Sequence, residues 1–121
     1  MVLDTNILIA YLDGDLRVVE AINARSAHGL ALFISAVSYA EILSLPEAGA
    51  ADLIKMRNFL NNFILVDVNK ELAEISAEIK RQYKFKFADS AIVATARLMA
   101  VSLVTRDKQL WKAKGVNLVE I

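Results

Sequence analysis

The chain has 121 residues, which is enough to bury the core of one ordinary domain. Its hydrophobic content of 56% is above that of an average globular domain and argues against a disordered chain. Because 14 basic residues balance 14 acidic ones, nucleic-acid binding needs a local basic patch, and the lack of cysteine excludes disulfides and thiolate chemistry.

Short apolar runs alternate with helical patterns along the whole chain. In chain order the sequence predicts a strand at 1–3, helices at 7–12 and 15–27, a strand at 31–34, helices at 36–45 and 51–61, a strand at 63–66, a helix after Asn69, a helix at 89–100, and strands at 102–104 and 118–119. The strand runs are continuously apolar, which is typical of strands covered on both faces. We therefore expect one α/β domain over residues 1–121, a three-layer α/β/α sandwich with a mainly parallel sheet of about five strands.

Nothing in the sequence suggests a membrane. Asp4 interrupts the chain before the apolar region of a signal peptide can form. The longest stretch without a charged residue, 26–40, is shorter than the roughly 18 apolar residues of a spanning helix. We expect a cytoplasmic protein.

Two acidic residues follow predicted strands. Asp4 comes directly after the strand at 1–3, and Asp107 closely follows the strand at 102–104. Ligands collect beyond the carboxyl ends of strands in parallel α/β sheets, so both acids are site candidates. Each is equally compatible with capping the helix that comes next, since Asp is a preferred cap.

Glu41 lies in the middle of an apolar helix that we expect to be buried. A lone buried carboxylate is costly unless it is paired or binds a metal, which favours a functional role over an ion pair with a basic residue. Asp89 begins another apolar helix, where a cap is as good an explanation as function.

A functional site is therefore predicted from four acids taken together: Asp4, Glu41, Asp89 and Asp107. Four carboxylates can converge at one edge of the sheet only if a cation compensates their charge. Oxygen ligands of this kind suit Mg²⁺ or Mn²⁺.

Four segments carry a family resemblance. They are Val2-Leu3-Asp4-Thr5-Asn6-Ile7-Leu8-Ile9, Ser35-Ala36-Val37-Ser38-Tyr39-Ala40-Glu41-Ile42, Phe87-Ala88-Asp89-Ser90-Ala91-Ile92-Val93-Ala94-Thr95-Ala96 and Leu103-Val104-Thr105-Arg106-Asp107. In this order they resemble the motifs of PIN-domain nucleases, and most of all VapC-type toxins of prokaryotic toxin–antitoxin pairs. The resemblance covers nearly the whole chain.

The resemblance implies an endoribonuclease that hydrolyses RNA with Mg²⁺ or Mn²⁺, forms homodimers and is inhibited by a small antitoxin protein. It makes Asp4, Glu41, Asp89 and Asp107 the catalytic, metal-binding acids, with Thr5, Asn6 and Thr105 supporting them. One departure is Gln109, which stands where many members have a further acid, so a second metal is expected to be held weakly.

Two groups of basic residues flank the proposed site and are candidates for RNA binding. The first is Lys80, Arg81, Lys84 and Lys86, interleaved with aromatic residues, and the second includes Arg106 and Lys108. A solvated surface explains the first group equally well. We expect Trp111 to lie in the core and His28, the single histidine, to cap a helix end or lie on the surface.

Three other functions remain open. A catalytically inactive domain of the same fold, binding RNA or protein as a scaffold, is favoured only by Gln109. A response-regulator-like phosphoacceptor domain requires a second acid next to Asp4, where Thr5 stands, although Asp67 follows the third strand. A haloacid-dehalogenase-like phosphatase requires an acid in place of Asn6.

Overall fold

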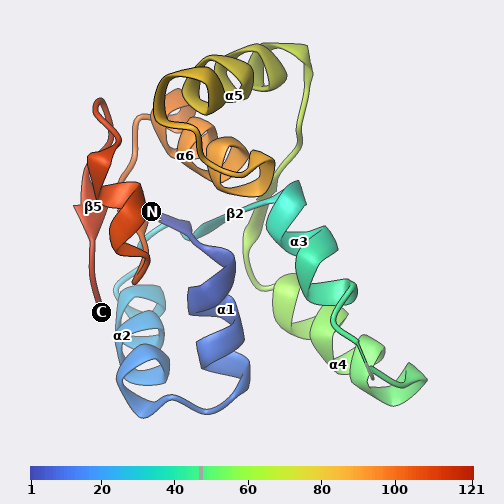
Figure 1. Cartoon of the computed structure of the whole chain (residues 1–121). Helices are drawn as coiled ribbons and strands as arrows, with labels where there is room; N and C mark the ends of the chain where they lie inside the picture. Colours follow the sequence, from blue (N-terminus) through green and yellow to red (C-terminus); the bar gives the residue numbers. More distant parts are fainter. Residues whose placement is uncertain (47) are drawn as a thin grey trace.

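The structure is a computed structural model that describes residues 1–46 and 48–121 (Figure 1). Its elements are β1 (Val2–Leu3), α1 (Thr5–Leu12), α2 (Leu16–Ala27), β2 (Phe33–Ser35), α3 (Ala36–Leu43), α4 (Ala50–Leu60), β3 (Ile64–Val66), α5 (Lys70–Tyr83), α6 (Phe87–Met99), β4 (Leu103–Val104), the 3₁₀ helix η1 (Lys108–Lys112) and β5 (Leu118–Val119). The predicted order of strands and helices is confirmed, with ends shifted by a few residues.

The described residues form a five-stranded sheet in the order β3-β2-β1-β4-β5, and all neighbouring strands are parallel. The first strand is central, with Val2 opposite Phe33 of β2 and Leu103 of β4. Because the strands are parallel, the carboxyl ends of β1, β2 and β4 lie side by side. The residues that follow these three strands are therefore brought together.

Each face of the sheet is covered by helices, and successive strand residues point into different cores. Val2 and Leu103 pack in one core with residues of α5 and α6. Leu3 and Val104 are buried in the other, with residues from α1 to α4. Figure 1 shows α5 and α6 together above the sheet, with α1 to α4 below it. The predicted three-layer α/β/α fold is confirmed. Burial on both faces explains the continuous apolar runs of β1 and β4, whereas Ile64 and Leu65 of the edge strand β3 are exposed.

Hydrogen bonds from side chains set several helix starts. Asn69 Oδ1 accepts from the backbone N–H of Leu72 at 2.9 Å and caps α5, as predicted. The hydroxyl of Ser35 caps α3 in the same way. The alternative explanation of Asp89 as a helix cap is wrong, because α6 begins at Phe87, with Lys86 in the capping position. Asp89 therefore lies within the first turn of α6.

No helix among residues 1–46 and 48–121 combines the length and the apolar character that crossing a bilayer requires.

Candidate active site

Asp4 lies at the end of the central strand and is almost completely buried, with 3% of its surface exposed. It occupies the position before α1, but its side chain makes no capping hydrogen bond there. Its Oδ2 instead accepts a hydrogen bond of 2.7 Å from the Thr105 hydroxyl, which follows β4. The capping explanation for the Asp4 side chain is therefore wrong.

The surroundings of Asp4 disfavour its charged form. Burial raises the pKa of this carboxyl to about 6, and the negative charges of Asp89 and Asp107 add to the increase, while the hydrogen bond from Thr105 opposes it. The three carboxylates, which come from distant parts of the chain, therefore influence one another through space. A carboxyl perturbed by burial and by like charges is typical of a functional site.

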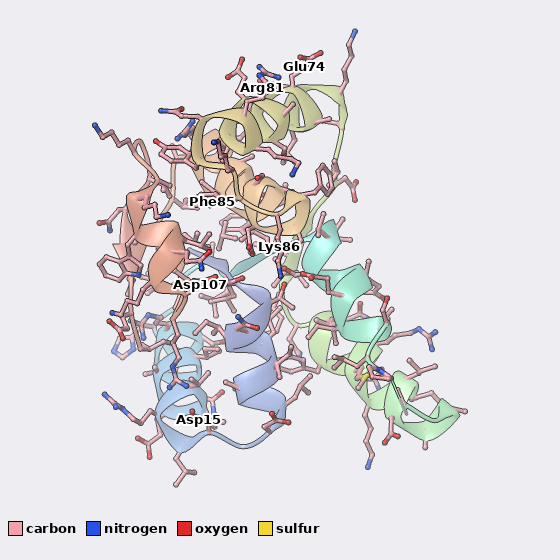
Figure 2. The ribbon with its side chains drawn as sticks, in the orientation of Figure 1. Asp15, Glu74, Arg81, Phe85, Lys86 and Asp107 are labelled. Atoms are coloured by element: carbon pink, nitrogen blue, oxygen red, sulfur yellow. The ribbon has the colours of Figure 1, made fainter. Side chains whose placement is uncertain are left out.

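Thr105 connects Asp4 with Asp107. Its hydroxyl donates to Asp4 and accepts from the backbone N–H of Asp107 at 3.0 Å. Asp107 Oδ1 accepts from the backbone N–H of Gln109 at 3.0 Å and caps η1. The capping explanation for Asp107 is thus confirmed, and the same side chain lies close enough to Asp4 and Asp89 for its charge to raise both of their pKa values. Figure 2 shows Asp107 near the centre of the molecule.

Glu41 is exposed, so the predicted burial of its carboxylate was wrong. The reason is that α3 buries the face carrying Ser38 and Ile42 and leaves Glu41 at the surface. The Thr5 hydroxyl donates to Glu41 Oε1 at 2.7 Å, and a second hydrogen bond of 2.8 Å joins Thr5 and Ser38. Ser38, which the sequence did not single out, is completely buried and lies one turn before Glu41. The sequence feature that could have identified Ser38 is a serine inside an otherwise apolar helix.

Asp89 connects the cluster with α6 and α3. Partial burial raises the pKa of its carboxyl, the charges of Asp107 and Glu41 raise it further, and the positive charge of Lys86 lowers it. Figure 2 shows Lys86 between α6 and α3, on the side of the molecule where α1 begins. Glu41 and Asp89 are therefore neighbours, although they belong to different helices.

The chemistry of these donors fits a hard divalent cation. All four candidate ligands are carboxylates, the ligand type that Mg²⁺ and Mn²⁺ prefer, and their like charges raise the pKa values of two of them. Within residues 1–46 and 48–121, no group of three acidic or histidine side chains is arranged tightly enough to hold a metal ion. Metal binding therefore requires these side chains to close around the ion.

The predicted RNA-binding residues are distributed unevenly. Lys86 lies beside Asp89, whereas Figure 2 shows Arg81 with Glu74 at the top of the molecule on α5, away from Asp107. Lys80 donates to the backbone carbonyl of Phe85 at 3.3 Å. Lys84 ends α5 in a left-handed conformation. The first basic group is therefore split between the site and a remote surface.

The second basic group is engaged in ion pairs. Arg106 lies 2.7 Å from Asp15, and Lys108 lies 2.5 Å from Glu120. Lys108 is also 4.9 Å from the ring centre of Trp111. The prediction of a core position for Trp111 was wrong, because 43% of its surface is exposed.

The remaining predicted residues lie as follows. Asn6 is exposed in the first turn of α1, next to the buried Thr5. Gln109 is exposed on η1. His28 is exposed and forms the carboxyl-terminal cap of α2, as predicted, with Nδ1 2.6 Å from the carbonyl of Ala24.

Comparison with known proteins gives one family and a consistent set of structures. The model of the PIN domain matches residues 1–116. A chain in a toxin–antitoxin complex from Klebsiella pneumoniae is 28% identical, with a TM-score of 0.82 over 99% of this chain and 98% of that chain. A search among curated proteins finds no match.

Two further structures share the fold at lower identity. One is VapBC2 from Rickettsia felis bound to a DNA fragment from its promoter, with 18% identity, a TM-score of 0.86 and coverage of 99% and 97% of the two chains. The other is DNA-bound VapBC from Salmonella typhimurium, with 18% identity, a TM-score of 0.82 and coverage of 98% and 96%. The resemblance to the VapC type is confirmed, and this chain belongs to the PIN-domain family.

Proposed function

We propose that this protein is a metal-dependent endoribonuclease and the toxin of a toxin–antitoxin pair. The observation that carries the proposal is the cluster in which Asp89 and Asp107 act on the buried carboxylate of Asp4. Family membership supports nuclease chemistry, and the structural neighbours come from toxin–antitoxin complexes. The proposed substrate is cytoplasmic RNA, with Mg²⁺ or Mn²⁺ as the cofactor.

Asp4, Asp89 and Asp107 would hold the cation, with Glu41 binding it directly or through water. When bound, the cation supplies charge neutralisation at the scissile phosphate and a more acidic water. Thr105 keeps one oxygen of Asp4 fixed by its hydrogen bond. Thr5 does the same for Glu41, so both carboxylates are oriented before a ligand arrives.

The site also has a means of attracting RNA. Lys86 is a positive charge beside Asp89, where it can contact a backbone phosphate. A shallow and mostly apolar depression adjoins Glu41; it is lined by Ala36, Val37, Ala40, Ser44 and Val68. Such a surface can receive the face of an unstacked base.

The chelator experiment tests the enzymatic part of the proposal. Purified protein should cleave a mixture of structured RNAs with Mg²⁺ or Mn²⁺, lose cleavage in EDTA and regain it when metal is restored. Asp89→Asn should be inactive, and Asp67→Asn, at an exposed carboxylate after β3, should keep full activity. Cleavage that persists in EDTA contradicts the metal mechanism. RNA binding without cleavage supports an inactive scaffold instead.

The toxin part is tested in cells. Expression of the wild type without its partner should stop growth and degrade RNA, whereas Asp89→Asn at equal expression should do neither. An antitoxin can inhibit such a site simply by placing an arginine or lysine among the carboxylates. Size measurement of the purified protein tests the proposed homodimer. Undisturbed growth with intact RNA would contradict the toxin role and leave the nuclease role standing.

A further inference from the structure

In the sequence, Arg106 lies between Thr105 and Asp107 of the candidate site. Its own hydrogen-bond partners lie outside the carboxylate cluster. Its Nε donates to the backbone carbonyl of Ile121 at 2.7 Å, and its Nη1 donates to Asp15 Oδ2 at 2.7 Å. The charge of Asp15 and this hydrogen bond raise the pKa of the Arg106 guanidinium. Arg106 thus joins the turn after β4 to α2 and to the segment after β5.

The acceptor on α2 is itself held in place. Asp15 Oδ1 caps α2 by accepting from the backbone N–H groups of Arg17 and Val18 at 3.1 and 3.4 Å. Its other oxygen is the one that binds Arg106. A single carboxylate therefore serves both the helix start and the guanidinium. Figure 2 shows Asp15 below Asp107.

The turn that Arg106 anchors is the one that orients the site. Thr105, on one side of Arg106, donates to Asp4, and Asp107, on the other side, acts on Asp4 through its charge. The backbone N–H of Asp107 returns to the Thr105 hydroxyl at 3.0 Å. Any rotation of the backbone at Arg106 would therefore displace both neighbours relative to Asp4.

We infer that Arg106 is a positioning residue of the nuclease site, and that its pair with Asp15 fixes the 105–107 turn against Asp4. This inference rests on the proposed function. Two nitrogens of the guanidinium, Nε and Nη1, donate hydrogen bonds to the protein itself, which favours positioning over contact with RNA.

The first test is kinetic and uses Arg106→Gln, Asp15→Asn and the double variant. Asparagine caps a helix as well as aspartate does, so Asp15→Asn weakens the ion pair and preserves the start of α2. We expect each single variant to lower kcat by about tenfold to a hundredfold, the size of effect that a small misplacement of catalytic groups produces. KM should stay within about twofold, and the double variant should be no worse than the single ones.

Two further variants distinguish positioning from general damage. Arg106→Lys keeps the charge but loses the fork of donors, so it should recover only part of the activity. Arg25→Gln removes an arginine that donates to the Ala21 carbonyl on α2, and it should leave kcat unchanged. Because the side chains of Arg106 and Asp15 are 35% and 33% exposed, none of these variants should lower Tm by more than about 5 °C.

The second test does not depend on RNA cleavage. In the metal-free protein, the amide hydrogens of Asp107 and Gln109 should exchange about tenfold faster in Arg106→Gln and in Asp15→Asn, as expected when a turn loses its anchoring hydrogen bond. Arg25→Gln should leave these amides unchanged. Assigned NMR spectra provide the measurement.

These measurements distinguish a failure of the Arg106 inference from a failure of the proposed nuclease function. A higher KM with unchanged kcat would identify Arg106 as an RNA contact and overturn the inference, as would additive effects of the two substitutions or unchanged amide exchange. If the wild type cuts no RNA but both variants show faster exchange, the anchoring role stands and the proposed nuclease function fails.

Discussion

The candidate site has two sides that are built differently. The strand side consists of Asp4, Thr105 and Asp107, at the ends of β1 and β4, and two of its residues are almost completely buried. The helix side consists of Glu41 on α3, Asp89 in the first turn of α6 and Lys86 just before α6. Glu41 and Lys86 are exposed, and Asp89 is partly buried. Hydrogen bonds run through the whole strand side, from Asp4 to Gln109.

This difference separates two tasks that a metal-binding nuclease must perform. A buried carboxylate with a fixed oxygen provides a rigid ligand, but its charge is costly until a cation arrives. The exposed carboxylate of Glu41 costs little in the empty site and can move to complete the coordination, whereas Asp89 is partly buried and its pKa is raised. Burial on one side and exposure on the other therefore give a site that is oriented but still accessible. The following four predictions test this division.

The largest effect is expected on activity, and it should be equal on the two sides. Asp4→Asn and Glu41→Gln should each lower kcat/KM by on the order of a thousandfold, because several kcal/mol of transition-state stabilisation would depend on the metal that we propose these ligands hold. RNA cleavage at saturating Mn²⁺ measures the loss, with Asp67→Asn as the control. Full activity of either variant would remove that residue from the site.

The second effect, on stability, should differ between the sides. The pKa of Asp4 is raised from 3.8 to about 6, so its folded form binds more protons than the unfolded chain between these values, and stability falls as the pH rises through that window. In EDTA at pH 8, Asp4→Asn should therefore be more stable than the wild type by on the order of 3 kcal/mol, the equivalent of this pKa change.

Denaturant unfolding at several pH values checks this expectation. The advantage of Asp4→Asn should shrink as the pH falls from 6 towards 4, where the wild-type carboxyl becomes protonated. Glu41→Gln, at an exposed position, should stay within about 0.5 kcal/mol of the wild type at pH 8. A destabilised Asp4→Asn variant at pH 8 would show that the buried carboxylate is compensated by some other group.

The third prediction compares the two supporting hydroxyls. Thr105→Val should lower kcat by about tenfold to a hundredfold, because it removes the hydrogen bond to a buried ligand and leaves the Asp107 N–H without its acceptor. Thr5→Val should cost less, since water can replace the hydroxyl at the exposed Glu41. Single-turnover cleavage measures both variants. A larger loss of kcat for Thr5→Val would mean that the helix side, and not the strand side, is the rigid part of the site.

The smallest effect is expected for Lys86. In EDTA, where we expect no cleavage, Lys86→Gln should weaken RNA binding a few-fold. It should reduce the slope of log affinity against log salt by about 0.7, the contribution of one phosphate contact on a single strand. Lys70→Gln, at the exposed start of α5, is the control. An unchanged slope would mean that Lys86 acts on Asp89 through its charge and does not contact RNA.

Much of the fold could be predicted because its determinants are local. Continuous apolar runs identified all five strands, and the capping residue Asn69 marked the start of α5. The positions of Asp4 and Asp107 after parallel strands were enough to place them at one edge of the sheet. The same logic could not show that Thr105 would bond to Asp4, because that contact joins residues 101 positions apart.

What the sequence determined by itself was the order of strands and helices, the burial of β1 and β4 on both faces, and the family resemblance that the candidate acids carry. Tertiary structure alone decided the environment of each acid. Glu41 was expected to be buried and is exposed, because the packing of neighbouring helices selects which face of an apolar helix is covered. Arg106, a candidate for RNA binding, is paired with Asp15 at the start of α2, a residue 91 positions away in the chain. Burial and charge pairing depend on distant partners, which a local pattern does not contain.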